Sequence, residues 1–306
     1  MPANDAQPGT PVEALRRELW AIRDPGGGWK GAPEGAVSVE ATALAIAALE
    51  ASAAPGDPGL EDARSRLVQL QREDGGFPVG PDVPEPSWVT SIAGLLLRTD
   101  PATRNAAVGA ARWLLENEGL RPGLVGRLRR RAFGFAGPVD VDVDVVGWGW
   151  LPNTFSWVEP TACAALLLRS LRAELGPRSI DERMEEVRAL YADRECAGGG
   201  WNYGNRAVFD ANLPPIPDST AVALIGAQGW GSEPWVDRGF EALDRMAADA
   251  PSPLTYSLTR LARRLHSRPS AGVDAIEYQT RNTLLPQTRN YALAILAERR
   301  HPVFEL

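Results

Sequence analysis

The 306-residue sequence predicts an all-α fold, an α/α toroid in which about six helix pairs form an inner and an outer ring. Three observations predict it. Glycine turns that end in an aromatic residue recur along the chain, an Ala/Leu-rich segment follows each turn, and amphipathic segments lie between these units. Because the length of the unit varies, the pattern favours a closed barrel over a strict solenoid.

The glycine turns are the first part of the repeat. Glycine permits a positive φ and a close approach of the backbone, so each turn can reverse the chain while its aromatic ring packs against the next unit. The four turns span residues 24–29, 71–77, 146–150 and 197–201.

The segments after the turns are apolar almost all round, which is typical of helices that are buried on both sides. They span residues 39–49, 88–97, 158–168 and 217–225, and weaker copies begin near Leu254 and Gln287. These segments predict an inner ring of helices that lines a central cavity.

The segments between them carry arginine and glutamate on one face, which predicts outer helices exposed to solvent on one side. They span residues 12–22, 60–71, 106–116, 181–192, 235–247 and 273–282. We therefore expect a disordered tail over residues 1–11 and a single toroid domain over 12–306, with a long insertion at about 120–153.

Composition excludes several classes of function. The 32 basic and 39 acidic residues give a net charge of -7, which disfavours binding to nucleic acid. Neither a signal peptide nor a run of ~18 apolar residues is found, which predicts a cytoplasmic protein without a transmembrane segment. Cys163 and Cys196 lack the spacing of metal ligands, and His266 and His301 offer little material for a catalytic triad. We therefore expect no bound zinc.

Two motifs resemble a known superfamily. The turn Gln71-x-x-x-Gly75-x-Phe77 is similar to the Q-x-x-x-G-x-W repeat of squalene-hopene and oxidosqualene cyclases, and the Thr-Ala-x-Ala-Leu helix starts resemble the same superfamily. Residues 147–162 and 198–205 resemble stand-alone bacterial proteins with prenyltransferase/squalene-oxidase repeats. Over residues 12–300 the resemblance implies a terpene cyclase-like toroid that binds an isoprenoid, or another apolar small molecule.

The resemblance also implies a catalytic position. Class II terpene cyclases carry D-x-D-D-T-A at an inner-helix start, and its middle Asp protonates an alkene or an epoxide. The corresponding stretch here has Glu159 at the acid position, while Trp157 and Pro160 replace the flanking carboxylates. Protein prenyltransferase β subunits instead hold zinc with an Asp, a Cys and a His, and this sequence does not offer such a set.

Glu159 is therefore the candidate general acid. Aromatic faces could stabilise a carbocation, and an acidic residue at another helix start could help to bind the substrate. The candidate substrate-binding residues are Trp148, Trp150, Phe155, Trp157, Trp201, Tyr203 and Asp218. A structural alternative exists for each kind: Glu40, Glu159 and Asp218 could cap their helices, and the tryptophans could be packing wedges between units.

Two charged stretches lie in the insertion. Asp140, Asp142 and Asp144 alternate with valines and could collect Mg²⁺ and hence a diphosphate, although a solvated edge strand is the alternative. The arginines of residues 121–131 could contact a diphosphate or the surface of a membrane, or form a solvated loop.

Two hypotheses for function follow. The first is a cyclase-like protein that binds a polyprenyl chain in the central cavity and starts cyclisation with a proton from Glu159. The second is a non-catalytic toroid that binds a lipid, a peptide or a partner protein. An open apolar cavity with Glu159 on its wall favours the first, whereas a cavity plugged by Trp and Arg side chains favours the second.

Overall fold

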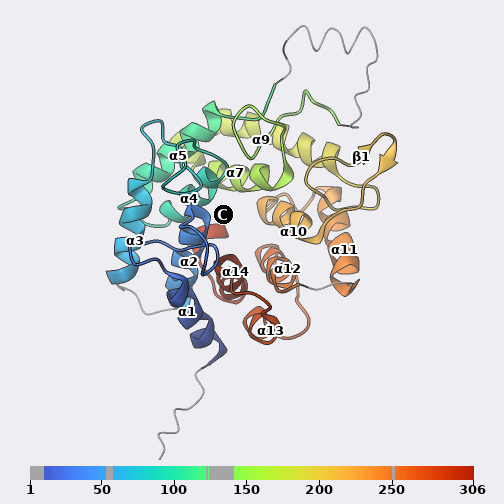
Figure 1. Cartoon of the computed structure of the whole chain (residues 1–306). Coiled ribbons are helices and arrows are strands. Elements are labelled where there is room, and N and C mark those ends of the chain that lie inside the picture. The colour runs from blue at the N-terminus through green and yellow to red at the C-terminus, as the bar shows by residue number, and fades with distance from the viewer. Residues whose placement is uncertain (1–9, 53–57, 122, 124–140, 250–251) are drawn as a thin grey trace, which may run out of the picture.

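The computed structural model describes residues 10–52, 58–121, 123, 141–249 and 252–306. Its inner ring consists of α2 (Val39–Ser52), α4 (Val89–Leu97), α7 (Val158–Ser170), α10 (Pro217–Gly226), α12 (Pro253–Leu265) and α14 (Thr288–Glu298). Each of these helices packs on the next, and α14 packs against α2, so the ring closes (Figure 1).

An outer ring surrounds the inner one (Figure 1). It consists of α1 (Pro11–Ile22), α3 (Pro58–Gln69), α5 (Arg104–Glu116), α9 (Pro177–Arg194), α11 (Pro234–Asp249) and α13 (Ala275–Asn282). The short helix α8 (Arg172–Leu175), a hairpin of β1 (Ala207–Val208) and β2 (Ala211–Asn212), and the 3₁₀ turn η1 (Pro302–Phe304) complete the described elements. The predicted α/α toroid is confirmed, whereas residues 1–9 of the expected tail and most of the expected insertion lie outside the described residues.

The two rings differ in burial, as their sequence patterns predict. In α2 every residue from Ala41 to Leu49 is buried, because this helix is covered by outer helices on one side and by its inner neighbours on the other. The outer helix α1 buries only Leu15, Leu19 and Ile22, which follow one face of the helix.

Each glycine turn is tied to the inner helix that follows it. The N–H of the turn's aromatic residue donates to a buried threonine hydroxyl in the first turn of that helix. The pairs are Trp29 and Thr42 at 2.9 Å, Phe77 and Thr90 at 2.8 Å, Trp148 and Thr161 at 2.9 Å, and Trp201 and Thr220 at 3.0 Å. The threonine of each Thr-Ala helix start therefore satisfies a backbone donor that the tight turn leaves buried.

The tryptophan side chains tie the same turns to the outer ring. Each indole Nε1–H donates to a main-chain oxygen near the end of the preceding outer helix. The acceptors are Leu19 for Trp29 at 2.7 Å, Leu114 for Trp148 at 2.8 Å and Tyr191 for Trp201 at 2.8 Å. One residue thus fixes the corner between an outer helix and the next inner helix.

The Gln71 turn shows why such a corner needs glycine. Gln71 Nε2 donates to the oxygens of Gly75, at 2.9 Å, and of Ala106, at 2.8 Å, which joins the turn to α5. Gly75 has a φ of +94°, and a Cβ placed on it would lie 2.5 Å from the main-chain oxygen of Gly109.

We therefore expect Gly75→Ala to lower the free energy of unfolding by more than the ~1–3 kcal/mol that a strained φ costs. Chemical denaturation measures it. Gly198→Ala is the matched control, because Gly198 also has a positive φ, of +87°, but a Cβ there would meet nothing within 4 Å. Equal losses in the two variants would contradict the predicted clash with the backbone of α5.

The C-terminal segment closes one end of the ring. Arg98, directly after α4, donates to the oxygens of Pro302 and Glu305, both at 2.6 Å. Gln228, just beyond α10, donates to the oxygen of Phe304 at 2.7 Å. Because these contacts come from the C-terminal ends of inner helices, the segment lies across that end of the barrel.

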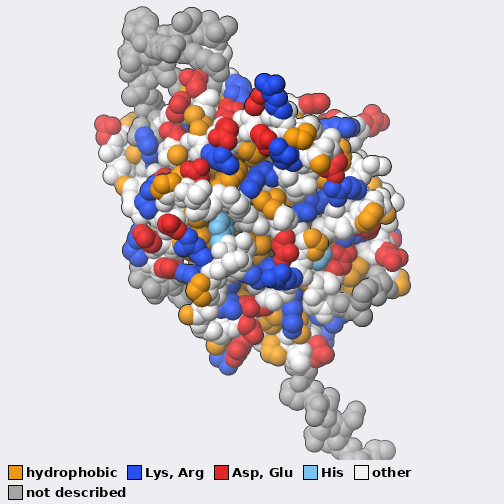
Figure 2. Space-filling view, turned by 180° about the vertical axis from the view of Figure 1, so that it is seen from behind, with side chains coloured by type: hydrophobic (Ala, Val, Ile, Leu, Met, Phe, Trp, Pro, Cys, Tyr) orange, Lys and Arg blue, Asp and Glu red, His pale blue; other side chains and the backbone are white. Residues whose placement is uncertain are grey.

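Figure 2, which shows the molecule from behind, displays basic and acidic side chains interspersed over the face opposite to the view of Figure 1.

Candidate functional site

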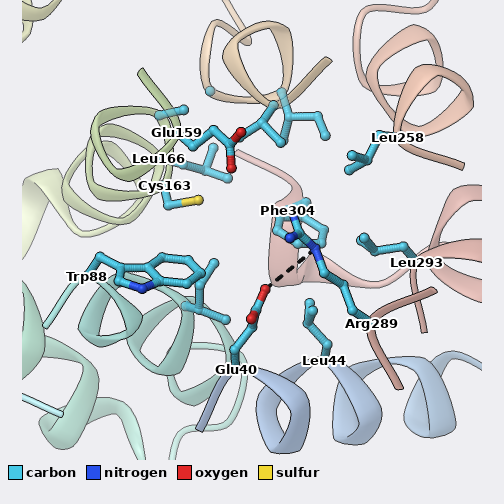
Figure 3. A pocket seen from close by; sticks show the side chains of 15 residues that line it. Glu40, Leu44, Trp88, Glu159, Cys163, Leu166, Leu258, Arg289, Leu293 and Phe304 are labelled. Carbon is cyan, nitrogen blue, oxygen red and sulfur yellow. Dashed lines mark ion pairs between the residues drawn. The ribbon is translucent and has the colours of Figure 1, made fainter. Parts of the chain in front are cut away.

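A cavity occupies the middle of the inner ring (Figure 3). Its walls surround about 520 Å³ of space when the part open to solvent is counted, and the centres of water-sized spheres can occupy about 40 Å³ of it. Every inner helix contributes to its wall, and the lining residues are Glu40, Leu44, Trp88, Ile92, Glu159, Ala162, Cys163, Leu166, Val222, Ile225, Gly226, Leu258, Arg289, Leu293 and Phe304. Apart from two carboxyls and one guanidinium, this described lining is apolar, a glycine or a cysteine.

The three charged residues occupy the same position in the repeat. Glu40, Glu159 and Arg289 are each the second residue of an inner helix, namely α2, α7 and α14. Because the inner helices run in the same direction, their first turns lie at the same end of the barrel, and Figure 3 shows the three side chains pointing toward the cavity. Arg289 Nε lies 3.5 Å from Glu40 Oε1, and Ser219 Oγ donates to Glu159 Oε1 at 2.7 Å.

Burial raises the pKa of Glu40 above its ordinary value of 4.5. The positive charge of Arg289 opposes this shift and the negative charge of Glu159 adds to it, but the loss of hydration outweighs both. Glu40 therefore keeps its proton to a higher pH than an exposed glutamate does.

Cys163 lies one helical turn beyond Glu159 and faces the same space. Burial raises the pKa of its thiol to about 12, and the nearby Glu159 adds to the shift. A thiol that stays protonated is a poor nucleophile, so Cys163 serves as apolar wall.

The structure places the predicted site residues in different regions of the toroid. Glu159 lines the cavity, as the acid hypothesis requires. Trp148 and Trp201 are almost fully buried in the corners between outer and inner helices, where the wedge alternative places them. Trp150 packs edge-on against Trp88, with ring centroids 4.9 Å apart, so it supports the cavity wall from behind.

The remaining predicted aromatics form a separate cluster. The ring of Trp157 lies 5.8 Å from that of Phe155 and 6.2 Å from that of Tyr203, which is half exposed. In the described part of the chain this cluster lies outside the cavity lining.

Asp218 also lies outside the lining. Its Oδ1 accepts a hydrogen bond of 2.5 Å from Thr255 Oγ1, and Ser252 Oγ accepts from the N–H of Thr255 at 3.0 Å. Asp218 therefore holds the start of α12 against α10, and this hydrogen bond goes to the neighbouring helix and not to the first N–H groups of its own helix.

Only part of the two charged stretches of the insertion lies among the described residues. Asp140 and the arginines from Arg127 to Arg131 lie outside the described residues. Asp142 and Asp144 are exposed, and the chain from 141 to 145 forms a turn, so the expected edge strand is wrong there. The turn arises because Asp142 Oδ1 accepts from the N–H of Asp144 at 2.9 Å, which bends the backbone. Within the described ranges no group of three or more His, Cys, Asp or Glu residues is placed to hold a metal ion.

Among the described lining residues Glu159 alone was predicted as a site residue, and those missed include Glu40, Trp88 and Arg289. Glu40 occupies the same place in its repeat as Glu159, which is a usable signal, although the same position also suits a helix cap. Trp88 directly precedes an inner helix, just as Trp157 does. The copy of the repeat that contains Arg289 is too weak for its position to be recognised.

Comparisons with known proteins support the fold. No protein-family model matches the chain, and no curated protein matches it either. Among solved structures, an inactive variant of the α-1,6-mannanase GH76A of Salegentibacter sp. HEL1_6, in complex with α-1,6-mannotriose, is 13% identical and has a TM-score of 0.60, over 94% of this chain and 97% of that one. A protein from Actinoplanes is 21% identical, with a TM-score of 0.50 over 89% and 77%.

A variant of the type II terpene cyclase MstE from Scytonema, in complex with merosterolic acid A, is 14% identical, with a TM-score of 0.48 over 96% and 80%. At such identities the first two likenesses define the chain as an α/α toroid protein and leave the substrate open. In the described part of the chain, no helix combines the length and the apolar character needed to span a bilayer.

Proposed function

We propose that this protein binds a linear isoprenoid with its hydrocarbon chain in the central cavity and rearranges it by proton transfer. The observation that carries the proposal is an apolar cavity in which the charged groups of the described lining gather at one end. An apolar chain gains free energy by leaving water for such a lining, whereas a polar head remains at the charged end. Arg289 offers a guanidinium there for an anionic head such as a diphosphate.

The two carboxyls divide the proton transfer between them. Glu40 delivers its proton to one carbon of an alkene, which leaves a carbocation at the neighbouring carbon. Glu159 then takes a proton from an adjacent carbon, either directly or after another alkene of the same chain has closed a ring onto the cation. Each turnover moves one proton from Glu40 to Glu159, and proton exchange with solvent returns both carboxyls to their starting states, so no redox partner is needed.

The proposal changes the role given to Glu159 from sequence. Glu40 is assigned the role of proton donor because burial raises its pKa, so its acid form persists to a higher pH than that of an exposed glutamate. Trp88, on the cavity wall beside these groups, supplies an aromatic face that can stabilise the cation.

The mannanase likeness suggests a sugar as the alternative ligand. A sugar carries a hydroxyl on almost every carbon, and each hydroxyl that is buried needs a hydrogen-bond partner. Below the charged end, the described walls present leucine, isoleucine, valine and phenylalanine side chains. A hydrocarbon suits these walls better than an α-1,6-linked mannose chain does.

The test is to incubate the purified protein with farnesyl diphosphate, geranylgeranyl diphosphate and squalene, and to analyse the extracts by mass spectrometry and chromatography. We expect saturable binding and a product isomeric with its substrate. Binding with unchanged ligand would support the non-catalytic toroid instead. Absence of binding by all three, together with binding of α-1,6-mannotriose, would overturn the proposal in favour of the sugar.

A further inference from the structure

We propose that Phe304, carried by the C-terminal segment, is the floor of the cavity and limits the length of the hydrocarbon chain that can bind. This inference rests on the proposed function and deepens it. Phe304 lines the cavity although it belongs to neither ring of helices, and it is 7% exposed. Figure 3 shows its ring behind the charged residues, at the base of the space that they enter.

The segment that carries Phe304 is firmly held by side chains from the barrel. Arg98 and Gln228 hold its main-chain oxygens, and Arg264 donates to Glu305 Oε1 at 2.8 Å. His301 Nε2 lies 3.0 Å from Glu50 Oε2, at the end of α2. Contacts from α2, from α12 and from residues just beyond α4 and α10 thus fix the floor against the ring.

The distance from the charged end to this floor is short. Glu159 and Leu166 mark the two ends of the wall formed by α7, and they are about two helical turns, or roughly 10 Å, apart. Beyond them the ring of Phe304 meets the end of any extended chain. A chain longer than the cavity must therefore displace Phe304 or leave its last carbons in water.

The floor also leaves the charged end as the entrance for a ligand. The C-terminal segment covers the end of the barrel away from Glu40 and Arg289, so a ligand enters past the charged residues with its apolar end first. The polar head of the ligand then stops at Arg289, and its hydrocarbon chain must fit between Arg289 and Phe304.

The experiment is calorimetric titration of the full chain with geranyl, farnesyl and geranylgeranyl diphosphates, and with n-alkyl phosphates of increasing length. We expect Phe304→Ala to raise the affinity for the longest chains about tenfold relative to the shortest, because each additional buried methylene is favourable. Phe304→Trp is expected to shift the preference toward shorter chains. Phe304→Leu, a milder truncation, replaces the alanine variant if that variant is too unstable to titrate.

Val303→Ala is the matched control, because Val303 is buried in the same segment but does not line the cavity. It is expected to leave the length preference unchanged. An equal shift in Val303→Ala, or no shift in either Phe304 variant, would overturn the inference while leaving isoprenoid binding intact. Binding of alkyl phosphates but not of prenyl diphosphates would contradict the proposed function and still test the floor, whereas failure of both series would overturn both proposals.

Discussion

Replacing Trp201 by alanine is expected to lower the free energy of unfolding by about 3–5 kcal/mol, which is the usual cost of removing a buried aromatic side chain. The ring of Trp201 is fully buried between α9, α10 and α11. It packs against Tyr191 and Trp235, with ring centroids 5.5 and 5.7 Å apart, and its Nε1–H donates to the oxygen of Tyr191. Alanine leaves a cavity there and an unpaired carbonyl.

Urea unfolding followed by circular dichroism measures this loss. Trp201→Phe keeps most of the volume but removes the indole donor, so we expect it to lie between the wild type and the alanine variant. Phe209→Ala is the surface control, because its side chain is 80% exposed, and its effect should stay within about 0.5 kcal/mol. A loss below 1 kcal/mol in Trp201→Ala would show that the corner does not depend on this wedge.

The corners of the fold were predictable from sequence because their chemistry is local. Gly75, Phe77 and Thr90 lie within a short stretch of chain, so turn, wedge and hydroxyl can be recognised together. The sequence did not determine the direction in which each aromatic side chain points. Trp201 points toward the outer helix whereas Trp88 faces the cavity, and this choice depends on packing against α9 and α7, which neighbouring residues do not encode.

The site was less predictable because it is assembled by ring closure. Glu159 could be proposed from its place at a helix start. The sequence does not show that Glu159 and Glu40 face the same cavity. The contact between Glu40 and Arg289 exists because the ring closes, with α14 packed against α2 from the opposite end of the sequence. Phe304 likewise reaches the cavity only because Arg98 and Gln228 bring the C-terminal segment across the barrel.

Replacing Glu40 by glutamine is expected to lower product formation by about 100- to 10,000-fold, the range by which a positioned proton donor accelerates a reaction. Glutamine keeps the shape of the side chain but cannot donate a proton to carbon, so ligand binding should be retained. Asp218→Asn is the matched control, because Asp218 stands at the same position of its helix but bonds to Thr255 outside the cavity. Steady-state kinetics with the substrate found active, together with calorimetric binding, separates the two effects.

The pH dependence follows from the direction of the pKa shift. Because the pKa of Glu40 is raised in the folded protein, its acid form persists above the ordinary value of 4.5 and activity falls as the pH rises through the shifted pKa.

The same pKa shift of Glu40 affects the stability of the fold. The folded state binds this proton more tightly than the unfolded chain does, so the contribution of Glu40 to stability is complete below the unfolded pKa and is lost as the pH rises through the folded pKa. Glu40→Gln should therefore gain stability relative to the wild type on going from acid to neutral pH, as thermal unfolding at several pH values can measure. A Glu40→Gln variant that keeps full activity, while Glu159→Gln loses it, would return the role of the acid to Glu159.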